Sequence, residues 1–150
     1  MTDEELLAVA LEQARIGLAE GGIPIGAAIA VDGVVVGAGH NRRVQQGSAI
    51  HHGETNALEV AGRLPASVYR RATMATTLSP CDMCTGAILL YGIPRLVIGE
   101  NRTFYGGEDH LRSRGVEVVN LDSAECVELM NEFIAAHPDI WFEDIGEVED

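Results

Sequence analysis

The two most informative segments of the sequence are Ser79-Pro80-Cys81-Asp82-Met83-Cys84 and the earlier His52-Gly53-Glu54. These two segments bring two thiols, one imidazole and one carboxylate. Structural zinc takes four protein ligands in a closed tetrahedron, whereas catalytic zinc takes three and keeps one position open. Because His52, Cys81 and Cys84 offer three ligands, the pattern predicts one catalytic zinc ion per chain.

The two cysteines stand three positions apart, so on a helix both thiolates lie on one face and can bind a single ion. Proline is favoured in the first turn of a helix and serine is favoured as its cap, so Ser79-Pro80 predicts a helix start. In a first turn the positive end of the helix dipole favours thiolate over thiol, which is the form that zinc binds.

His52 opens a second predicted helix, which runs from Gly53 to about Gly62. Residues two apart do not face each other on a regular helix, so His52 and Glu54 reach one site only at the helix entry. A carboxylate that is not a ligand but lies beside a catalytic zinc can take a proton from the attacking water. Glu54 is therefore predicted to be the general acid/base of a hydrolase.

The same residues allow plainer interpretations. A Cys-x-x-Cys pair can be a redox dithiol, or half of a four-ligand structural zinc site in a non-catalytic zinc-stabilised module. His51 could compete with His52 for the metal, but only His52 has the one-residue spacing to Glu54. Four other side chains could add a fourth ligand if the fold brought them close: His40, His110, His137 and Cys126. Cys126 lies in an amphipathic stretch, which is more typical of a buried small apolar residue.

The length of 150 residues fits a single domain spanning 1–150, with enough chain to bury a core. The chain has no positively charged, apolar secretory start and no uninterrupted apolar run of about 18 residues, so we expect no membrane association and a cytoplasmic protein. Three cysteines, two of them assigned to metal, fit a reducing compartment.

The charge is strongly acidic, with 23 acidic and 10 basic side chains and a formal net charge of −13. Proteins that bind nucleic acid depend on lysine and arginine clusters that displace counterions. The basic pairs Arg42-Arg43 and Arg70-Arg71 are too small for this, and we expect them to be solvated loop charges. The composition argues against a nucleic-acid partner and favours a small neutral substrate.

Helical and strand-like patterns alternate along the chain. The capping-box spacing of 2–5 predicts a first helix that ends near Gly21-Gly22. Runs 26–31 and 34–36, joined by Asp32-Gly33, predict a hairpin. Three further runs predict strands at 73–77, 95–98 and 116–121, and the spacing of Asp122 and Glu125 predicts the cap of a later helix. This order favours an α/β layered fold with parallel strands.

Five segments together closely resemble the fungal-type, yeast-like cytosine deaminases of the zinc-dependent cytidine deaminase superfamily: Gly39-His40-Asn41, 77–87, 91–95, Gly99-Glu100-Asn101 and 141–147. The zinc motif alone specifies only the superfamily, and the Asn41 and Trp141 segments specify the narrower family. The resemblance covers nearly the whole chain. It implies a three-layer α/β/α sandwich around a five-stranded mixed sheet, a homodimer, and hydrolysis of cytosine to uracil and ammonia, a step of pyrimidine salvage.

Matching motifs carry the site residues of that family onto this chain. The resemblance implies zinc on His52, Cys81 and Cys84 and a proton shuttle at Glu54. Six residues would bind the substrate: the 2-oxo group would be held by Asn41 and the Gly53 amide, the exocyclic amine by Asp144 and the Ser79 carbonyl, and the ring by Phe104 and Trp141. From the residues alone, Asn41 could equally stabilise a turn and Trp141 could anchor the core.

The chain departs from the fungal pattern in three places. His51 replaces an apolar residue, segment 105–110 is acidic and glycine-rich where the family has lysine, and the tail continues through 148–150. All three could border the pocket. Cytosine is therefore the expected substrate, and cytidine, guanine or a related aminopyrimidine stays the alternative.

Overall fold

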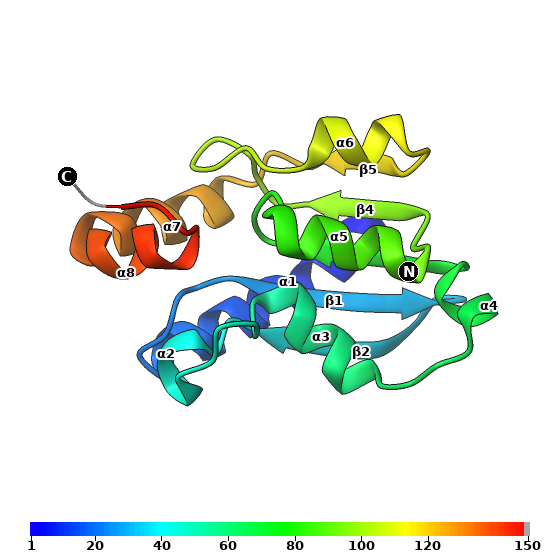
Figure 1. Cartoon of the computed structure of the whole chain (residues 1–150), viewed down its shortest axis with the longest axis horizontal. Helices are drawn as coiled ribbons and strands as arrows, with labels where there is room; N and C mark the ends of the chain where they lie inside the picture. The colour runs from blue at the N-terminus through cyan, green and yellow to red at the C-terminus, as the bar shows by residue number, and fades with distance from the viewer. Residues whose placement is uncertain (149–150) are drawn as a thin grey trace.

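A five-stranded mixed sheet forms the centre of the computed structural model, which describes residues 1–148 (Figure 1). The strand order is β2-β1-β3-β4-β5. Strand β1 (Gly26–Val31) is antiparallel to β2 (Val34–His40) and to β3 (Ala72–Thr76). Strands β4 (Arg95–Ile98) and β5 (Glu117–Asn120) continue parallel to β3. The predicted α/β fold around a five-stranded mixed sheet is confirmed.

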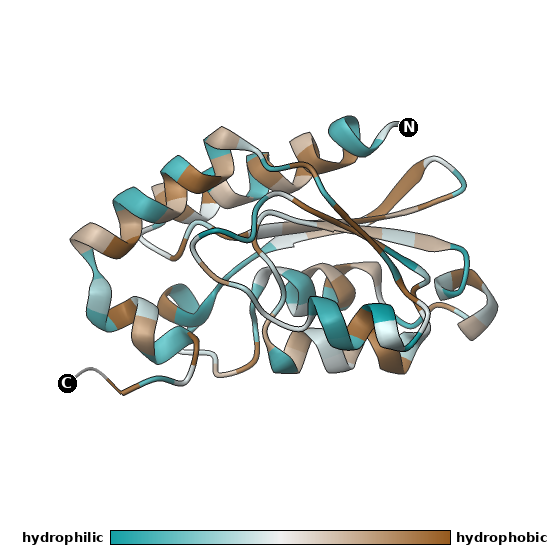
Figure 2. Ribbon diagram, turned by 90° about the horizontal axis from the view of Figure 1, so that it is seen from above, coloured by the Kyte–Doolittle hydropathy of each residue, from teal (hydrophilic) through white to brown (hydrophobic). Residues whose placement is uncertain are grey.

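Helices cover both faces of the sheet, which gives the three predicted layers (Figure 2). One face carries α1 (Asp3–Ala19) and α7 (Ala124–Ala136), and the other carries α3 (Gly53–Ala61), α5 (Asp82–Tyr91) and α6 (Glu108–Ser113). Three shorter helices complete this part of the chain: α2 (Arg43–Gln46), α4 (Ala66–Tyr69) and α8 (Pro138–Asp144). Within residues 1–148, no helix is long and apolar enough to cross a lipid bilayer.

Small side chains let the helices approach the middle of the sheet closely. All six residues of β1, Gly-Ala-Ala-Ile-Ala-Val, are buried, because helices cover both of its faces. A Cβ on Gly26 would lie 2.0 Å from the Ala10 carbonyl oxygen, so α1 rests directly on the backbone of this strand. This close packing fixes the position of the first residue of β1, and Gly53, at the start of α3, lies beside that residue.

The hairpin and the first helix form as the sequence predicts. Asp32 and Gly33 both have positive φ, 51° and 78°, as the two-residue turn requires. Strand β2 runs on to His40 instead of ending at Val36, because β1 pairs with it over its whole length. Thr2 caps α1 by accepting a 3.1 Å hydrogen bond from the Glu5 N–H.

Two predicted helix caps are wrong by one or two residues. Ser79 does not cap α5, because its hydroxyl donates to Glu108 instead, and Cys81 takes the N-cap position. Ser123 and not Asp122 caps α7, with the Ser123 hydroxyl accepting from the Cys126 N–H at 3.3 Å. In both places more than one residue near the helix start can accept or donate, and tertiary contacts decide which one does.

Candidate active site

The amino ends of α3 and α5 meet at the edge of the sheet and bring the three predicted ligands together. His52 is the N-cap of α3, Cys81 is the N-cap of α5, and Cys84 lies in the first turn of α5. The His52 Nδ1 atom lies 3.4 Å from the Cys81 sulfur and 3.7 Å from the Cys84 sulfur. All three ligand atoms lie within 4.8 Å of one another.

These distances fit zinc. With Zn–S near 2.3 Å and Zn–N near 2.0 Å, a tetrahedral ion separates its nitrogen and sulfur ligands by about 3.5 Å. Within residues 1–148, no other histidine, cysteine, aspartate or glutamate joins this group. Cys126, one candidate for a fourth ligand, is buried in the cluster between α1, α7 and the sheet. The donor set is that of a zinc site with one open position.

The second ring nitrogen of His52 contacts a carboxylate. His52 Nε2 lies 3.2 Å from Asp144 Oδ1, and both side chains are almost fully buried. A carboxylate that accepts from the far nitrogen of a ligand histidine fixes the ring orientation and keeps the near nitrogen free for metal. Asp144 therefore touches a predicted zinc ligand, a contact that the sequence did not predict.

The pKa values of the three predicted ligands depend on one another. Hydrogen bonds from Cys84 and His52 lower the pKa of Cys81 to about 4, and the same contact with Cys81, together with burial, raises the pKa of Cys84. Burial alone would lower the pKa of His52, but its bonds to Asp144 and Cys81 outweigh this and raise that pKa to about 10. Because zinc binds thiolate and neutral imidazole, metal binding must release protons here.

Glu54 lies in the first turn of α3, two residues after the N-cap. Its side chain is buried, and it lines the same cavity as His52 and Cys81. Burial, followed by the negative Cys81 thiolate, raises the pKa of Glu54 to about 7. A carboxyl group in this setting can both take up and release a proton near neutral pH, as a general acid/base must.

The cavity beside these residues is small, about 20 Å³, and apolar side chains close it. Phe104 and Trp141 meet edge to face, with ring centroids 6.0 Å apart. Four of the six predicted substrate-binding residues line the cavity: Ser79, Phe104, Trp141 and Asp144. The other lining residues are Ile25, His52, Glu54, Leu78, Cys81 and Ile145.

Asn41 and Gly53 lie beside the cavity without being among its lining residues. The Asn41 Nδ2 donates to Asp144 Oδ1 at 2.9 Å, and its Oδ1 accepts from the Arg43 N–H at 3.0 Å. Asn41 thus does stabilise a turn, as the plainer interpretation allowed, and it also reaches the site. Gly53 is the first residue of α3, so its N–H has no acceptor within the helix.

Two buried glutamates brace the loop that carries Phe104. Glu108 accepts from the Ser79 hydroxyl at 2.7 Å, and the Gly106 N–H donates to that same hydroxyl at 2.9 Å. Glu100 accepts from the backbone N–H groups of Arg102 and Thr103. Both glutamates are fully buried, and sequence reasoning missed both, because an isolated glutamate in a polar loop gives no signal of burial.

The three departures from the fungal pattern have different positions. Tyr105 and Gly106 line a larger outer cleft of about 520 Å³ that also contains His52, Cys81 and Asp144. His51 is not among the lining residues of either cavity, and its ring lies 3.1 Å from the Gln46 side-chain oxygen. Val148 is exposed, and residues 149–150 lie outside the described part of the chain.

The prediction that Arg42-Arg43 are solvated loop charges is wrong. The Arg43 side chain is only 17% exposed and lies 3.4 Å from Asp144. Arg42 donates to the Asn56 side chain at 3.2 Å. Because their acceptors come from α3 and α8, the sequence near the two arginines does not reveal these contacts. Arg70 and Arg71, in contrast, are exposed as expected.

Comparison with known proteins agrees with this geometry. The family model of the cytidine and deoxycytidylate deaminase zinc-binding region matches residues 1–100. A cytosine deaminase from Candida albicans is 58% identical over 146 residues, which cover 97% of both chains. A tRNA-specific adenosine deaminase from Streptococcus pyogenes is 35% identical over 135 residues, 83% of this chain and 84% of the relative.

A solved structure of guanine deaminase from Nitrosomonas europaea superposes with a TM-score of 0.69 at 26% identity, covering 89% of this chain and 85% of that one. The family match, the relatives and the His-Cys-Cys group agree on one zinc ion and on hydrolytic chemistry. The chain belongs to the zinc-dependent cytidine and deoxycytidylate deaminase family.

Proposed function

We propose that the protein hydrolyses free cytosine to uracil and ammonia. The observation that carries this proposal is α8, which places Trp141 and Asp144 on the small cavity beside His52 and Glu54. A site closed by a helix of the same chain suits a compact base. The cytosine deaminase from Candida albicans, similar over 97% of its length, supports the choice of cytosine.

Zinc held by His52, Cys81 and Cys84 would lower the pKa of a coordinated water toward ~7 and so supply the nucleophile. Glu54 would take one proton from the water and give it to the ring nitrogen, and would then take the proton of the newly added hydroxyl and give it to the amine, which leaves as ammonia. Its burial among apolar side chains suits this role, because a carboxyl in such a place binds and releases protons near neutral pH.

The remaining residues orient the base. The Asn41 side chain and the Gly53 N–H hold the 2-oxo group, while Asp144 and the Ser79 carbonyl accept from the exocyclic amine. Asp144 Oδ1 already accepts from Asn41, so Oδ2 is the oxygen assigned to the substrate amine. Phe104 and Trp141 enclose the ring and keep water out, which strengthens the electrostatic interactions inside.

Bulkier substrates fit this arrangement poorly. We expect α8 to leave no room for a ribose, because its residues Trp141 and Asp144 line the small cavity, and the net charge of −13 repels the phosphates of a nucleic acid. The tRNA-specific adenosine deaminase from Streptococcus pyogenes is similar to this chain at a lower sequence identity, 35%, than the cytosine deaminase from Candida albicans, 58%. A cytoplasmic location is part of the proposal, since all three cysteines are free and two belong to the metal site.

A substrate panel tests the proposal. The purified zinc-loaded protein is incubated with cytosine, cytidine, guanine and adenosine, and ammonia release gives kcat/KM for each. We expect cytosine to exceed every other substrate by about 100-fold or more, because a closed pocket rejects added bulk. A preference for cytidine or guanine would refute the cytosine assignment and keep the deaminase chemistry, whereas no ammonia from any substrate would refute both.

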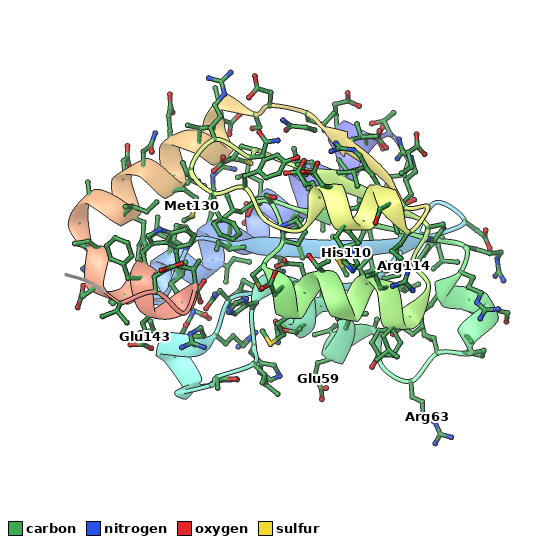
Figure 3. All side chains as sticks on the ribbon, turned by 45° about the horizontal axis from the view of Figure 1, so that its top comes forward. Glu59, Arg63, His110, Arg114, Met130 and Glu143 are labelled. Atoms are coloured by element: carbon green, nitrogen blue, oxygen red, sulfur yellow. The ribbon has the colours of Figure 1, made fainter. Side chains whose placement is uncertain are left out.

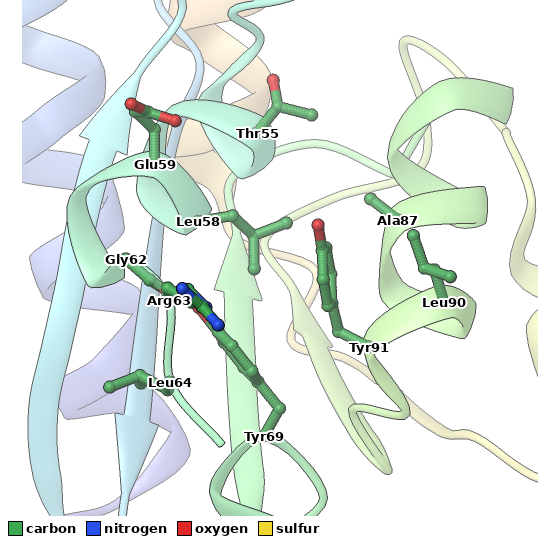
Figure 4. Close-up of a pocket in the computed structure, with 10 residues that line it drawn as sticks. All are labelled: Thr55, Leu58, Glu59, Gly62, Arg63, Leu64, Tyr69, Ala87, Leu90 and Tyr91. Carbon is green, nitrogen blue, oxygen red and sulfur yellow. The ribbon is translucent and has the colours of Figure 1, made fainter. Parts of the chain in front are cut away.

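The homodimer is also part of the proposal, and the support is an exposed apolar face on α3 and α5. A cleft of about 580 Å³ lies between these helices and α4, with Leu58, Tyr69 and Tyr91 around it (Figure 4). Leu90, on its rim, is 76% exposed. Glu59 and Arg63 add opposite charges to the same cleft and point outward (Figure 3), so two copies related by a two-fold axis can pair them.

A further inference from the structure

Helix α8 closes the site but is too short to be stable without tertiary contacts. It has seven residues, and no side chain caps its amino end. Helices shorter than about 12 residues are marginal alone and depend on tertiary contacts. Trp141 and Ile145 supply apolar contacts on the inner side of α8. The outer, polar side of α8 carries Glu143 and faces α2 (Figure 3).

Arg43, the first residue of α2, binds the two consecutive acidic residues of α8. Its Nη2 lies 3.2 Å from Glu143 Oε1, and its Nε lies 3.4 Å from Asp144 Oδ1. The remaining arm, Nη1, donates to the Ala49 carbonyl at 2.9 Å, which fixes the guanidinium against its own loop. One planar side chain thus connects the segment after β2 to the end of α8.

Of the two contacts that Arg43 makes with α8, the one with Asp144 is buried. The Asp144 side chain is 3% exposed, and its Oδ1 is shared by Arg43, Asn41 and His52. Of these three partners only arginine carries a permanent positive charge, since the amide is neutral and the imidazole must be neutral to bind metal. A buried carboxylate needs such a partner, and removing it leaves an uncompensated charge.

Arg43 also acts on Asn41. The Arg43 N–H donates to Asn41 Oδ1 at 3.0 Å, and Asn41 Nδ2 donates to Asp144 at 2.9 Å. Asn41, Arg43 and Asp144 therefore form a closed ring of contacts. Two members of the ring are assigned to the 2-oxo group and the exocyclic amine of the base, and Arg43 holds both.

We propose that Arg43 is a positioning residue for deamination, whose guanidinium keeps α8 closed over the base and fixes the orientations of Asp144 and Asn41. The kinetic part of this inference rests on the proposed function. The structural part, that Arg43 keeps α8 closed, does not rest on the proposed function, because it concerns the protein without substrate.

The kinetic test compares Arg43→Gln and Arg43→Lys with the wild type on cytosine. Loss of a charged hydrogen-bond network that binds the ground state should raise KM about tenfold and change kcat much less. Lysine keeps the charge but cannot contact Glu143, Asp144 and the Ala49 carbonyl at once. The KM of Arg43→Lys should therefore lie between those of the wild type and Arg43→Gln. A merely structural defect would instead lower the fraction of active enzyme, and with it kcat, in both variants.

The second measurement uses Trp141, the only tryptophan in the chain, which is 5% exposed and lies on α8. Acrylamide quenching of its fluorescence reports how often α8 leaves the site. We expect stronger quenching in Arg43→Gln than in the wild type, with zinc content unchanged. Glu143→Gln removes only the exposed outer contact and should give a smaller increase.

Arg15→Gln is the matched control, because Arg15 forms an exposed ion pair with Glu125 of α7, and within residues 1–148 it has no hydrogen bond or ion pair with α2 or α8. Its quenching and KM should equal those of the wild type. Wild-type quenching and wild-type KM in Arg43→Gln would overturn the proposal. If the wild type fails to deaminate cytosine, the proposed function is refuted, and the quenching measurement alone then tests whether Arg43 keeps α8 closed. If Arg43→Gln does not fold, wild-type quenching in both Arg43→Lys and Glu143→Gln overturns it.

Discussion

Two of the proposed zinc ligands, His52 and Cys81, occupy the same kind of backbone position. His52 has φ −76° and ψ 175°, and Cys81 has φ −70° and ψ 177°, so both are extended N-cap residues. The next chemical group follows within one turn, Glu54 in α3 and Cys84 in α5. The amino ends of α3 and α5 both carry partial positive charge, so the site between them favours anions such as two thiolates and a carboxylate.

The role of Glu54 is tested by Glu54→Gln, which keeps the shape of the side chain and removes its ability to carry a proton. We expect folding and zinc content close to those of the wild type and a fall in kcat of about 10²–10⁴-fold. Single-turnover kinetics on cytosine, with zinc measured by elemental analysis in the same samples, check this. A fully zinc-loaded Glu54→Gln protein with wild-type kcat would show that another group carries the proton.

The zinc ligands and Glu54 can be predicted from the spacing within short motifs, whereas the six substrate-binding residues follow only from the resemblance to the cytosine deaminases. His52 and Cys84 belong to short motifs, and local backbone geometry places each of them. Arg43 and Glu108 could not be predicted, because their partners Asp144 and Ser79 are distant in the chain and only the fold brings them close. Charged side chains in polar loops look solvated until the tertiary structure is known.

Among the helices and strands, the sequence predicted the five strands and the long helices, and it missed the short helices α2 and α8. The periodic patterns of α1, α3 and α7 and the turn residues of the β1–β2 hairpin are local signals, and the structure confirms them. Helices α2 and α8 were not predicted. Four and seven residues carry too little periodicity to reveal a helix, and these segments are helical because of what they contact.

The amino end of α1 is tied to the start of β4 by Asp3 and Arg95, and this contact has a defined pH dependence. Arg95 Nη2 donates to Asp3 Oδ2 at 2.8 Å. The hydrogen bond to Arg95 lowers the pKa of Asp3 below its ordinary value of 3.8. A lowered pKa means that the stabilisation is present above the ordinary value and is lost as the pH falls through the lowered one.

Asp3→Asn should therefore reduce the free energy of unfolding by about 1 kcal/mol at pH 7, an amount typical of a partly exposed bidentate pair. The difference from the wild type should shrink as the pH falls below about 4. Urea unfolding at several pH values measures it. Glu4→Gln removes an acidic group from the same helical turn and controls for the helix dipole. An equal loss in both variants would assign the effect to the dipole and not to Arg95.

At the scale of the whole molecule, the face proposed for dimerisation is the outer side of the two helices whose amino ends carry the zinc ligands. Association there would bury Leu90 and Tyr91 and brace α3 and α5 against each other. Bracing the helices would also hold the distances between His52 and the two cysteines. The proposed dimer thus contributes to the site without adding a residue to it.

Leu90→Arg should convert the dimer into a monomer, because it places a charge on an exposed apolar residue of the proposed interface, and the two-fold axis brings that residue into the contact once from each copy. Sedimentation velocity at micromolar concentration distinguishes the two states. Val34→Arg is the matched control, since Val34 is also an exposed apolar residue, 63% exposed, but lies on the hairpin strand β2. A monomeric wild type, or a Leu90→Arg protein that stays dimeric, would contradict the proposed interface.

The position of α8 near the end of the described chain sets the order in which the site is completed during protein synthesis. His52, Cys81 and Cys84 leave the ribosome before Pro138–Asp144, because synthesis proceeds from the amino end. The ligands are therefore available to the cellular zinc pool before Trp141 and Asp144 cover them. We therefore expect zinc to bind before α8 closes, and a protein synthesised without zinc would have to open α8 before the metal could reach its ligands.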